Sequence, residues 1–216
     1  MKPNTRIQKP NRRSGRWLAS ASFALTALAC VVPAMAASKY WDTATTANLQ
    51  FGNGNWDTGS TTLWSTATGG SSPLVSWAND DDAFFQTAGA NVVTITSSVR
   101  AKSFTITTNS TVLTLNGGTL QLGSAGANGN LTVGGNQDTS VISSNVQLLG
   151  SNPTWNIGRI LAITGPISES GGSYGFTQAT GTSTLKLSAG NTYTGNTTVN
   201  AGTLNLTTFT GASPNS

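Results

Sequence analysis

Short runs in which hydrophobic and polar residues alternate fill most of the chain from Asn91 onward. Pairs of apolar residues separated by one polar position recur along it, among them Val93 and Ile95, Leu120 and Leu122, and Leu185 and Leu187. A period of two turns one side of a β-strand toward a core and the other toward solvent. Apolar residues do not recur at helical spacing in this part of the chain. The pattern therefore predicts an all-β domain with almost no helix.

Clusters of glycine and asparagine separate the predicted strands, for example at residues 116–118, 134–136 and 189–191. Both residue types tolerate positive φ, which tight corners require. The strands begin about 7 to 11 residues apart, which fits an antiparallel β-sandwich or a β-solenoid with two or three short strands in each turn. Spacing alone does not distinguish these two architectures.

An internal repeat favours the solenoid. Residues 116–122 read NGGTLQL and residues 200–206 read NAGTLNL, so one pattern of turn plus strand occurs twice. Degenerate repeats of this kind are typical of stacked coils, in which each unit covers the apolar face of its neighbour. In such a stack, Thr, Ser and Asn side chains one turn apart form hydrogen-bonded ladders, whereas like charges repel one another.

The first 36 residues have the pattern of a bacterial export signal. Six Lys and Arg residues precede an apolar run over residues 17–32, and small residues follow at the expected cleavage site, Ala34 and Ala36. This order is that of a cleaved signal peptide. The apolar run is also shorter than the ~20 residues that a membrane-spanning helix needs. Cys30 lies within the run, and we interpret it as one of its apolar residues rather than as a lipidated cysteine.

Removal of the signal peptide changes the charge of the chain. All seven acidic residues but only five of the eleven basic ones follow residue 36, so the net charge falls from +4 to −2. Charged residues make up 8% of the chain, against about 25% in typical proteins. Such a neutral, Thr-rich and Asn-rich chain is typical of β-rich surface proteins. The lack of a basic face argues against nucleic-acid binding, and the lack of cysteine means that no disulfide stabilises the exported part.

Four tryptophans lie before the alternating runs, at Trp41, Trp56, Trp64 and Trp77. Exposed Trp faces stack on sugar rings and partner side chains, so these residues are candidate ligand-binding positions. A solenoid also has to close its first turn, and we favour such a cap as their role. The expected organisation is a signal peptide at residues 1–36, a Trp/Gly-rich N-terminal cap at 37–90 and β-solenoid repeats at 91–216, clearest at 184–207.

The chain offers little for catalysis. It has no His, and no Cys after the signal, which excludes Ser-His-Asp and Cys-His nucleophile systems and most zinc sites. Its one acidic cluster is Asp80, Asp81 and Asp82. We expect an exposed acidic loop there, with a calcium site or a pair of glycosidase carboxylates as the alternatives. Glu169 is the sole glutamate, so we expect no catalytic residue, no cofactor and no metal.

The C-terminal stretch LKLSAGNTYTGNTTVNAGTLNL contains the densest motif of the chain. Its motif positions are Leu185, Leu187, Gly190, Asn191, Tyr193, Gly195, Thr198, Val199, Gly202, Thr203, Leu204 and Leu206. This stretch resembles the autotransporter-associated β-strand repeat, which occurs in passenger domains of bacterial type V secreted proteins and in other large bacterial surface proteins. The resemblance implies a right-handed parallel β-helix that forms an elongated stalk at the cell surface.

These features together predict a non-enzymatic, adhesin-like structural passenger segment that is exposed at the cell surface or outer membrane, or is secreted. Retention in the periplasm is an alternative location. A carbohydrate-binding module that uses exposed Trp is the second hypothesis for function, and a polysaccharide lyase-like β-helix enzyme is the third. The expected partners are glycans or proteins on host or neighbouring cells. Membrane contact is expected only through the export machinery or through a barrel that this chain does not contain.

Overall fold

The computed structural model describes Met1 and residues 36–70, 73–86, 88–107, 111–124, 127–134, 139–181 and 183–207. Contacts within the chain divide it into Met1–Ala34 and Met35–Ser216, and all of the described strands lie in the second unit. Of the predicted cleavage site, Ala34 lies outside the described residues, while Ala36 is described and precedes the first strand.

The described residues contain 17 strands. They are β1 (Ser38–Trp41), β2 (Gly54–Trp56), β3 (Trp64–Ser65), β4 (Asp81–Phe85), β5 (Gly89–Ile106), β6 (Thr111–Ser124), β7 (Ala127–Asn128), β8 (Asn130–Val133), β9 (Ser140–Ile142), β10 (Asn145–Leu149), β11 (Thr154–Ile157), β12 (Leu161–Ile163), β13 (Ile167–Ser170), β14 (Phe176–Thr180), β15 (Thr184–Leu187), β16 (Thr197–Val199) and β17 (Thr203–Leu206). Among these residues no helix is long and apolar enough to cross a membrane.

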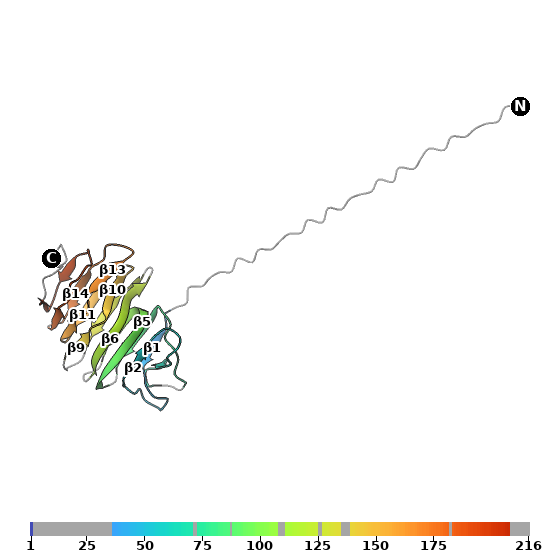
Figure 1. Ribbon diagram of the computed structural model, residues 1–216, viewed down its shortest axis with the longest axis horizontal. Coiled ribbons are helices and arrows are strands. Elements are labelled where there is room, and N and C mark those ends of the chain that lie inside the picture. Colours follow the sequence, from blue (N-terminus) through green and yellow to red (C-terminus); the bar gives the residue numbers. More distant parts are fainter. Residues whose placement is uncertain are drawn as a thin grey trace. The chain divides into compact units, whose positions relative to one another are not determined.

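The strands form a parallel β-solenoid of about five turns. One turn contains β9, β10 and β11 and the next contains β12, β13 and β14, and each strand pairs in parallel with its counterpart one turn later. The colours of Figure 1 accordingly pass in order from blue to red along the stack. The predicted β-solenoid is confirmed. The antiparallel β-sandwich is wrong, because nearly all strand pairs, including every pair between successive turns after β5, are parallel.

Three faces result from this winding. We call them the first face (β2, the start of β5, the start of β6, β9, β12, β15 and β17), the second face (the middle of β5, the end of β6, β10 and β13) and the third face (β4, the end of β5, β8, β11, β14 and β16). The long strand β5 continues around two corners, so it contributes to all three. Three strands in a turn agree with the two or three that the spacing predicts.

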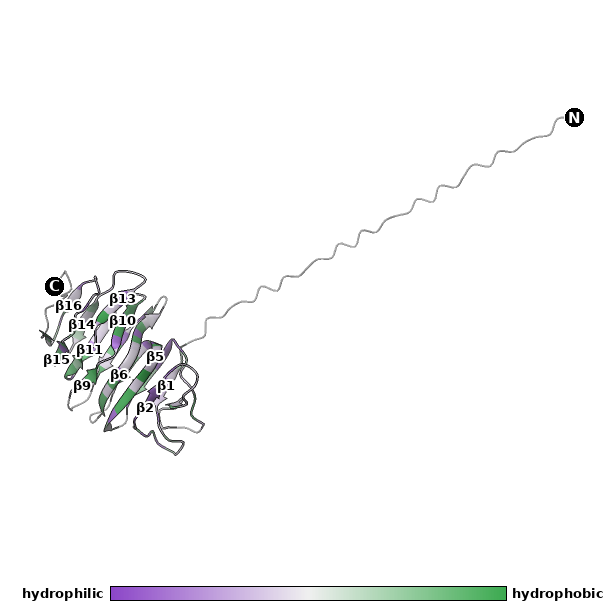
Figure 2. Cartoon of the chain, in the orientation of Figure 1, coloured by the Kyte–Doolittle hydropathy of each residue, from purple (hydrophilic) through white to green (hydrophobic). Residues whose placement is uncertain are grey.

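Apolar side chains that point inward lie directly above one another from turn to turn. The register pairs Leu115 with Ile142, Ile142 with Ile163 and Ile163 with Leu187 on the first face. These side chains are at most 2% exposed, and full burial of each stabilises the fold by about 1.5–3 kcal/mol. Figure 2 shows the resulting alternation of hydrophobic and hydrophilic positions along the strands. The period of two in the sequence therefore arises because one side of every strand faces a shared core.

The strands of the N-terminal segment lie on the side of β5 opposite to β6 and β8. Strand β4 pairs in parallel with the end of β5, and β1 pairs in parallel with the other edge of β4. Strand β2 pairs with the start of β5, and β3 runs antiparallel to β1. The expected boundary at residue 90 falls inside β5, so one strand continues from the Trp-rich segment into the repeats.

Candidate functional site

The four tryptophans of the N-terminal segment form one aromatic cluster in the core. The ring of Trp56 lies 5.1 Å from that of Trp64 and 5.0 Å from that of Trp77, and the rings of Trp41 and Trp64 are 5.1 Å apart between centroids. All four side chains are at most 2% exposed. Edge-to-face contacts of this kind add to the stabilisation by burial. In this structure none of the four rings presents a face on which a ligand could stack.

A repeated tripeptide accounts for two of these tryptophans. The sequence Trp-Asp-Thr occurs at residues 41–43 and again at 56–58. In both copies the Trp enters the core and the next Asp closes a turn. The Asp42 carboxylate accepts hydrogen bonds from the main-chain N–H of Ala44 (3.2 Å) and Gln50 (3.0 Å). The Asp57 carboxylate accepts them from the N–H groups of Ser60 and Thr61. Carboxylates used in this way hold the backbone.

The acidic cluster is not the exposed loop that the sequence predicts. Asp81 and Asp82 are the first residues of β4, and Asp81 is only 7% exposed. Asp81 accepts a hydrogen bond from the main-chain N–H of Ala37 (2.9 Å) and lies 3.9 Å from the Lys39 ammonium. Pairing of β1 with β4 covers Asp81, so the expectation of solvent exposure is wrong for this residue.

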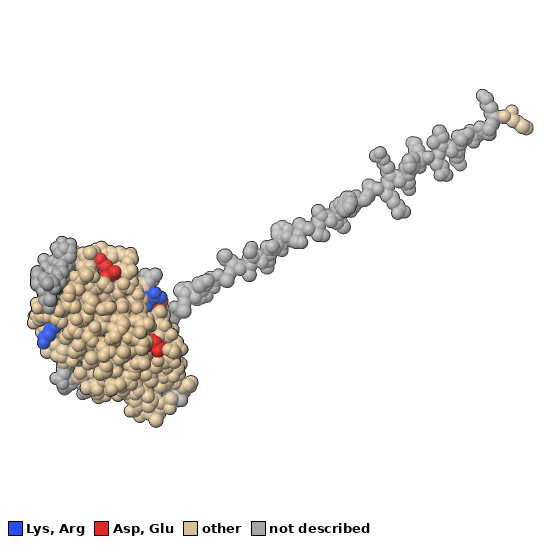
Figure 3. Space-filling model, in the orientation of Figure 1, with Lys and Arg blue, Asp and Glu red and all other residues tan. Residues whose placement is uncertain are grey.

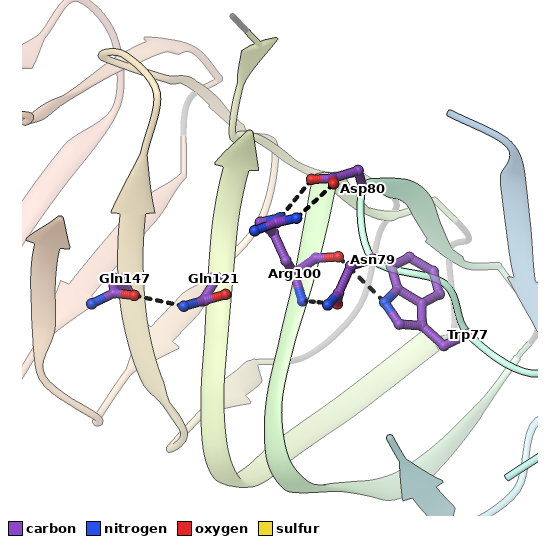
Figure 4. A network of polar contacts seen from close by, with 6 residues as sticks. All are labelled: Trp77, Asn79, Asp80, Arg100, Gln121 and Gln147. Atoms are coloured by element: carbon purple, nitrogen blue, oxygen red, sulfur yellow. Dashed lines mark hydrogen bonds and ion pairs between the residues drawn. The ribbon is translucent and has the colours of Figure 1, made fainter. Parts of the chain in front are cut away.

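The other two aspartates have separate partners. Asp80 forms a bidentate pair with Arg100, in which Nε and one terminal nitrogen lie 2.6 and 2.7 Å from the two carboxylate oxygens (Figure 4). This pairing raises the pKa of the Arg100 guanidinium. Asp82 accepts a hydrogen bond from the Ser103 hydroxyl at 2.6 Å. Among the described residues no group of three or more His, Cys, Asp and Glu side chains converges as a metal site would require.

The glutamine pair of Figure 4 forms a ladder between turns, of the kind that the sequence predicts for Thr, Ser and Asn. Gln121 on β6 and Gln147 on β10 are paired across one turn, and the Gln121 amide donates to the Gln147 carbonyl oxygen at 2.8 Å. On the third face, the Thr180 hydroxyl donates to the Asn156 side chain at 2.9 Å. Neutral polar side chains thus bond between turns at positions where stacked like charges would repel.

The C-terminal motif places its residues on two faces and on the corner between them. Strand β15 buries Leu185 and Leu187. Strand β16 contains Thr198 and Val199, and strand β17 contains Thr203, Leu204 and Leu206. Residues 190–195, between β15 and β16, take the place of a second-face strand. The side chain of Asn191 accepts a hydrogen bond from the Ile167 N–H at 2.9 Å. The Tyr193 ring is 3% exposed and lies 5.8 Å from the Phe176 ring.

Glu169 connects this motif to the preceding turn. Its carboxylate accepts hydrogen bonds from the main-chain N–H of Thr194 (2.9 Å), from the Thr194 hydroxyl (2.5 Å) and from the N–H of Tyr174 (2.6 Å). Partial burial alone raises the pKa of Glu169, but the hydrogen bonds from Thr194, Tyr174 and Gly195 outweigh it and hold the pKa below its usual value. The carboxylate is thus occupied by structural contacts.

Gly195 is required by close packing of the two turns. A Cβ atom at this position would lie 2.2 Å from the carbonyl carbon of Tyr174 and 2.2 Å from the nitrogen of Gly175. Both are backbone atoms, so neither can move aside as a flexible side chain could. The glycine of the motif therefore allows the chain between β15 and β16 to lie against the turn before it.

The third face carries two outward columns of polar side chains, which form a candidate binding surface. The first column follows the strand register through Asp82, Ser103, Asn130, Thr154, Thr177 and Thr198. The second column follows it through Tyr40, Phe84, Thr105, Thr132, Asn156 and Thr180. Every member is at least partly exposed. The sequence interpretation missed Tyr40 and Phe84, although alternation in β4, with Ala83 and Phe85 inward, indicates that Phe84 points outward.

The known proteins to which this chain is similar agree with this architecture. The model of the passenger-associated transport repeat matches residues 179–206, the segment that contains β15, β16 and β17. This C-terminal segment is thus similar to a passenger-associated transport repeat. It is also 32% identical over 196 residues to the adhesin BmaC autotransporter of Brucella suis biovar 1, an alignment that covers 88% of this chain. No solved structure matches the chain.

The predicted resemblance to autotransporter passengers is therefore confirmed. The alignment with the Brucella adhesin extends well beyond residues 179–206, so the likeness includes the less regular turns as well as the repeat. The chain spans about 5% of the length of that relative. The similarity to autotransporter passengers therefore concerns the solenoid of this chain and does not extend to the activity of the full-length Brucella adhesin.

Proposed function

We propose that this chain is a non-enzymatic, adhesin-like passenger segment that is exported and exposed at the bacterial cell surface or released from it. The observation that carries the proposal is the similarity to an autotransporter adhesin over most of a chain whose fold is a β-solenoid. Stacked turns project a surface over a long distance with few residues, because each turn needs only its neighbours for stability. That geometry suits a stalk or a contact surface.

The chemistry of the described side chains supports a structural role. Glu169, Asp57 and Asp80 are each bonded to backbone groups or to a cation, and adjacent aspartates in β4 point in different directions. A glycosidase requires two carboxylates that face one substrate bond, and a lyase requires a base with access to substrate. In the view of Figure 3 the charged side chains are isolated from one another on a surface that is mostly neutral.

Export is tested in the organism that encodes the chain. A strain that lacks the gene is complemented with the wild-type gene or with a variant that lacks residues 2–36, and intact cells are stained with antibodies and then treated with external protease. We expect the wild-type protein to be stained and digested on intact cells or recovered from the medium. The variant without residues 2–36 is expected to remain protected inside the cell.

Adhesion is tested with the same strains. Cells with the wild-type gene are expected to attach to target cells or to coated surfaces more strongly than the deletion strain does. A wild-type protein that stays protected from protease in intact cells would contradict the proposed location. Depolymerisation of a polysaccharide by the purified chain, lost in Glu169→Gln or Asp81→Asn, would replace the proposal with an enzymatic one.

A further inference from the structure

The two outward columns of the third face form a regular array of neutral hydrogen-bonding groups. Parallel register repeats the columns at the spacing of neighbouring strands, about 4.8 Å. From Ser103 to Thr198 and from Thr105 to Thr180 every member of both columns is Thr, Ser or Asn. Asp82 is the one charged residue in the columns, and the Ser103 hydroxyl bonds to it. From Ser103 and Thr105 onward, the two columns therefore offer hydrogen-bond donors and acceptors that carry no charge.

Several groups of this array have bonding capacity to spare. Within the described part of the chain, the hydroxyls of Thr105, Thr132 and Thr177 form no side-chain hydrogen bond, whereas Thr180 and Asn130 bond to neighbouring turns. A hydroxyl both donates and accepts, and it rotates to suit its partner. Such groups complement a ligand that itself carries many hydroxyls at repeated intervals.

An aromatic pair continues the second column at its N-terminal end. Tyr40 and Phe84 lie side by side in register, with ring centroids 5.0 Å apart and ring planes 24° from parallel. Both point away from the core and are partly exposed, unlike the four buried tryptophans. The weakly polar C–H face of a sugar ring packs against such a surface, while its hydroxyls bond to polar groups beside it.

We propose that the third face binds a neutral glycan chain that lies along the columns, with one sugar against Tyr40 and Phe84 and the following sugars on the Thr and Asn side chains. This inference rests on the proposed function, because it names the partner of an exported contact surface. A neutral partner follows from the lack of charge in the columns from Ser103 onward, because a polyanion would need a basic stripe. Lys39 and Lys102, which precede Tyr40 and Ser103 in the chain, each lie near an aspartate: the Lys39 ammonium is 3.9 Å from Asp81 and the Lys102 ammonium is 4.0 Å from Asp82.

The test measures binding of the purified chain to neutral hexasaccharides of glucose and of N-acetylglucosamine, with heparin as the anionic comparison, by calorimetry. The double variant Thr105→Val and Thr132→Val removes two hydroxyls but keeps the β-branched shape that favours a strand. The matched control is Gln121→Ala with Gln147→Ala on the second face, which removes an outward ladder of similar size. Thermal unfolding of each variant verifies that the fold is retained.

We expect at least one neutral hexasaccharide to bind, with affinity about tenfold weaker in the threonine variant, as loss of one or two hydrogen bonds predicts, and unchanged in the glutamine control. Binding should change little with salt, because no ion pair contributes to it. Tyr40→Ala should weaken binding as well. The inference would be overturned if wild type and threonine variant bound the hexasaccharides equally well, or if neither hexasaccharide bound. It would also be overturned if the chain preferred heparin or associated with itself through this face.

The proposed function can fail independently. Cells that display the protein and adhere to a surface from which glycans have been enzymatically removed would overturn the glycan inference and leave the adhesin-like function standing. Purified protein that binds glycans through the third face but never leaves the cell would contradict the proposed function and leave this inference standing.

Discussion

The side-chain oxygen of Asn191 accepts a hydrogen bond from the main-chain N–H of Ile167, with 2.9 Å between the two atoms. Ile167 is fully buried and lies one turn earlier in the stack than Asn191. In the turn that contains Asn191, the second face has no strand to continue the ladder. The asparagine of the motif therefore bonds a backbone group that a strand would otherwise satisfy.

Asn191→Ala should lower the free energy of unfolding by about 1–3 kcal/mol, because the buried N–H of Ile167 loses its acceptor. Urea unfolding followed by tryptophan fluorescence measures the change. Asn200→Ala is the matched control, since Asn200 is exposed and bonds to the preceding turn through its main chain. Equal midpoints for the two variants would show that the Asn191 contact contributes nothing.

A second prediction concerns stability in acid. Partial burial alone raises the pKa of Asp57, but hydrogen bonds from Thr61 and Ser60 outweigh it and lower the pKa from 3.8 to about 2. A carboxylate with a lowered pKa stabilises the folded state above its unfolded pKa, and this contribution is lost as the pH falls through the folded value. Stability from Asp57 should therefore be complete above pH 3.8 and disappear as the pH approaches 2.

Asp57→Asn keeps the side-chain oxygen but removes the charge, so it should be less stable than wild type at pH 7. The difference between the two proteins should shrink between pH 3.8 and pH 2. Thermal unfolding across this range measures it. A difference that stays constant from neutral to acid pH would contradict the assignment of the charge-dependent contribution to Asp57.

A third prediction concerns a buried amide in the core. Gln178 points inward on β14, one turn from Trp155 and one turn from Val199, and it is fully buried. Neither its Oε1 nor its Nε2 atom has a hydrogen-bond partner among the residues that the structure describes. Burial of an unsatisfied amide costs about 1–3 kcal/mol on mutational scales.

Gln178→Leu should therefore raise the free energy of unfolding by about 1 kcal/mol or more, because leucine fills a similar volume without polar atoms. Guanidinium unfolding at neutral pH measures the change. Gln147→Leu is the control, since Gln147 lies outward and its amide accepts a bond from Gln121. A Gln178→Leu variant less stable than wild type would indicate that the amide has a partner in solution.

The fourth prediction compares two buried tryptophans. The indole N–H of Trp41 donates to the carbonyl oxygen of Gly52 at 3.0 Å, whereas the indole N–H of Trp56 has no acceptor within the described part of the chain. Trp→Phe removes similar volume at both sites, but only Trp41→Phe also breaks a hydrogen bond. Trp41→Phe should be less stable than Trp56→Phe by about 1 kcal/mol.

Chemical unfolding of the two Trp→Phe variants, monitored by circular dichroism, gives this difference directly. Trp56→Ala serves as the reference for cavity formation, and we expect it to cost about 3–5 kcal/mol. If Trp56→Phe proves the more costly of the two, ring packing rather than hydrogen bonding dominates at this cluster.

The fold class and much of the core could be predicted from the sequence, since both depend on local pattern. Alternation marks the inward residues of strands such as β10 and β15, and burial of those residues follows the pattern. The repeat at residues 200–206 and the Asn/Gly corners pointed to a stack, and the C-terminal motif indicated the passenger likeness. These signals are local because side-chain period and corner geometry are set within a few residues.

The partners of each side chain were decided only by the tertiary structure. Asp81 is buried because Ala37, 44 positions away, donates to it after β1 pairs with β4. Tyr40 meets Phe84, and Thr105 aligns with Thr132, through a register that no short segment specifies. The register depends on how successive turns, which contain different numbers of residues, align with one another. That alignment is a property of the packed stack. The sequence by itself therefore determined which residues form strands and a core, and the stacking decided which outward side chains became neighbours.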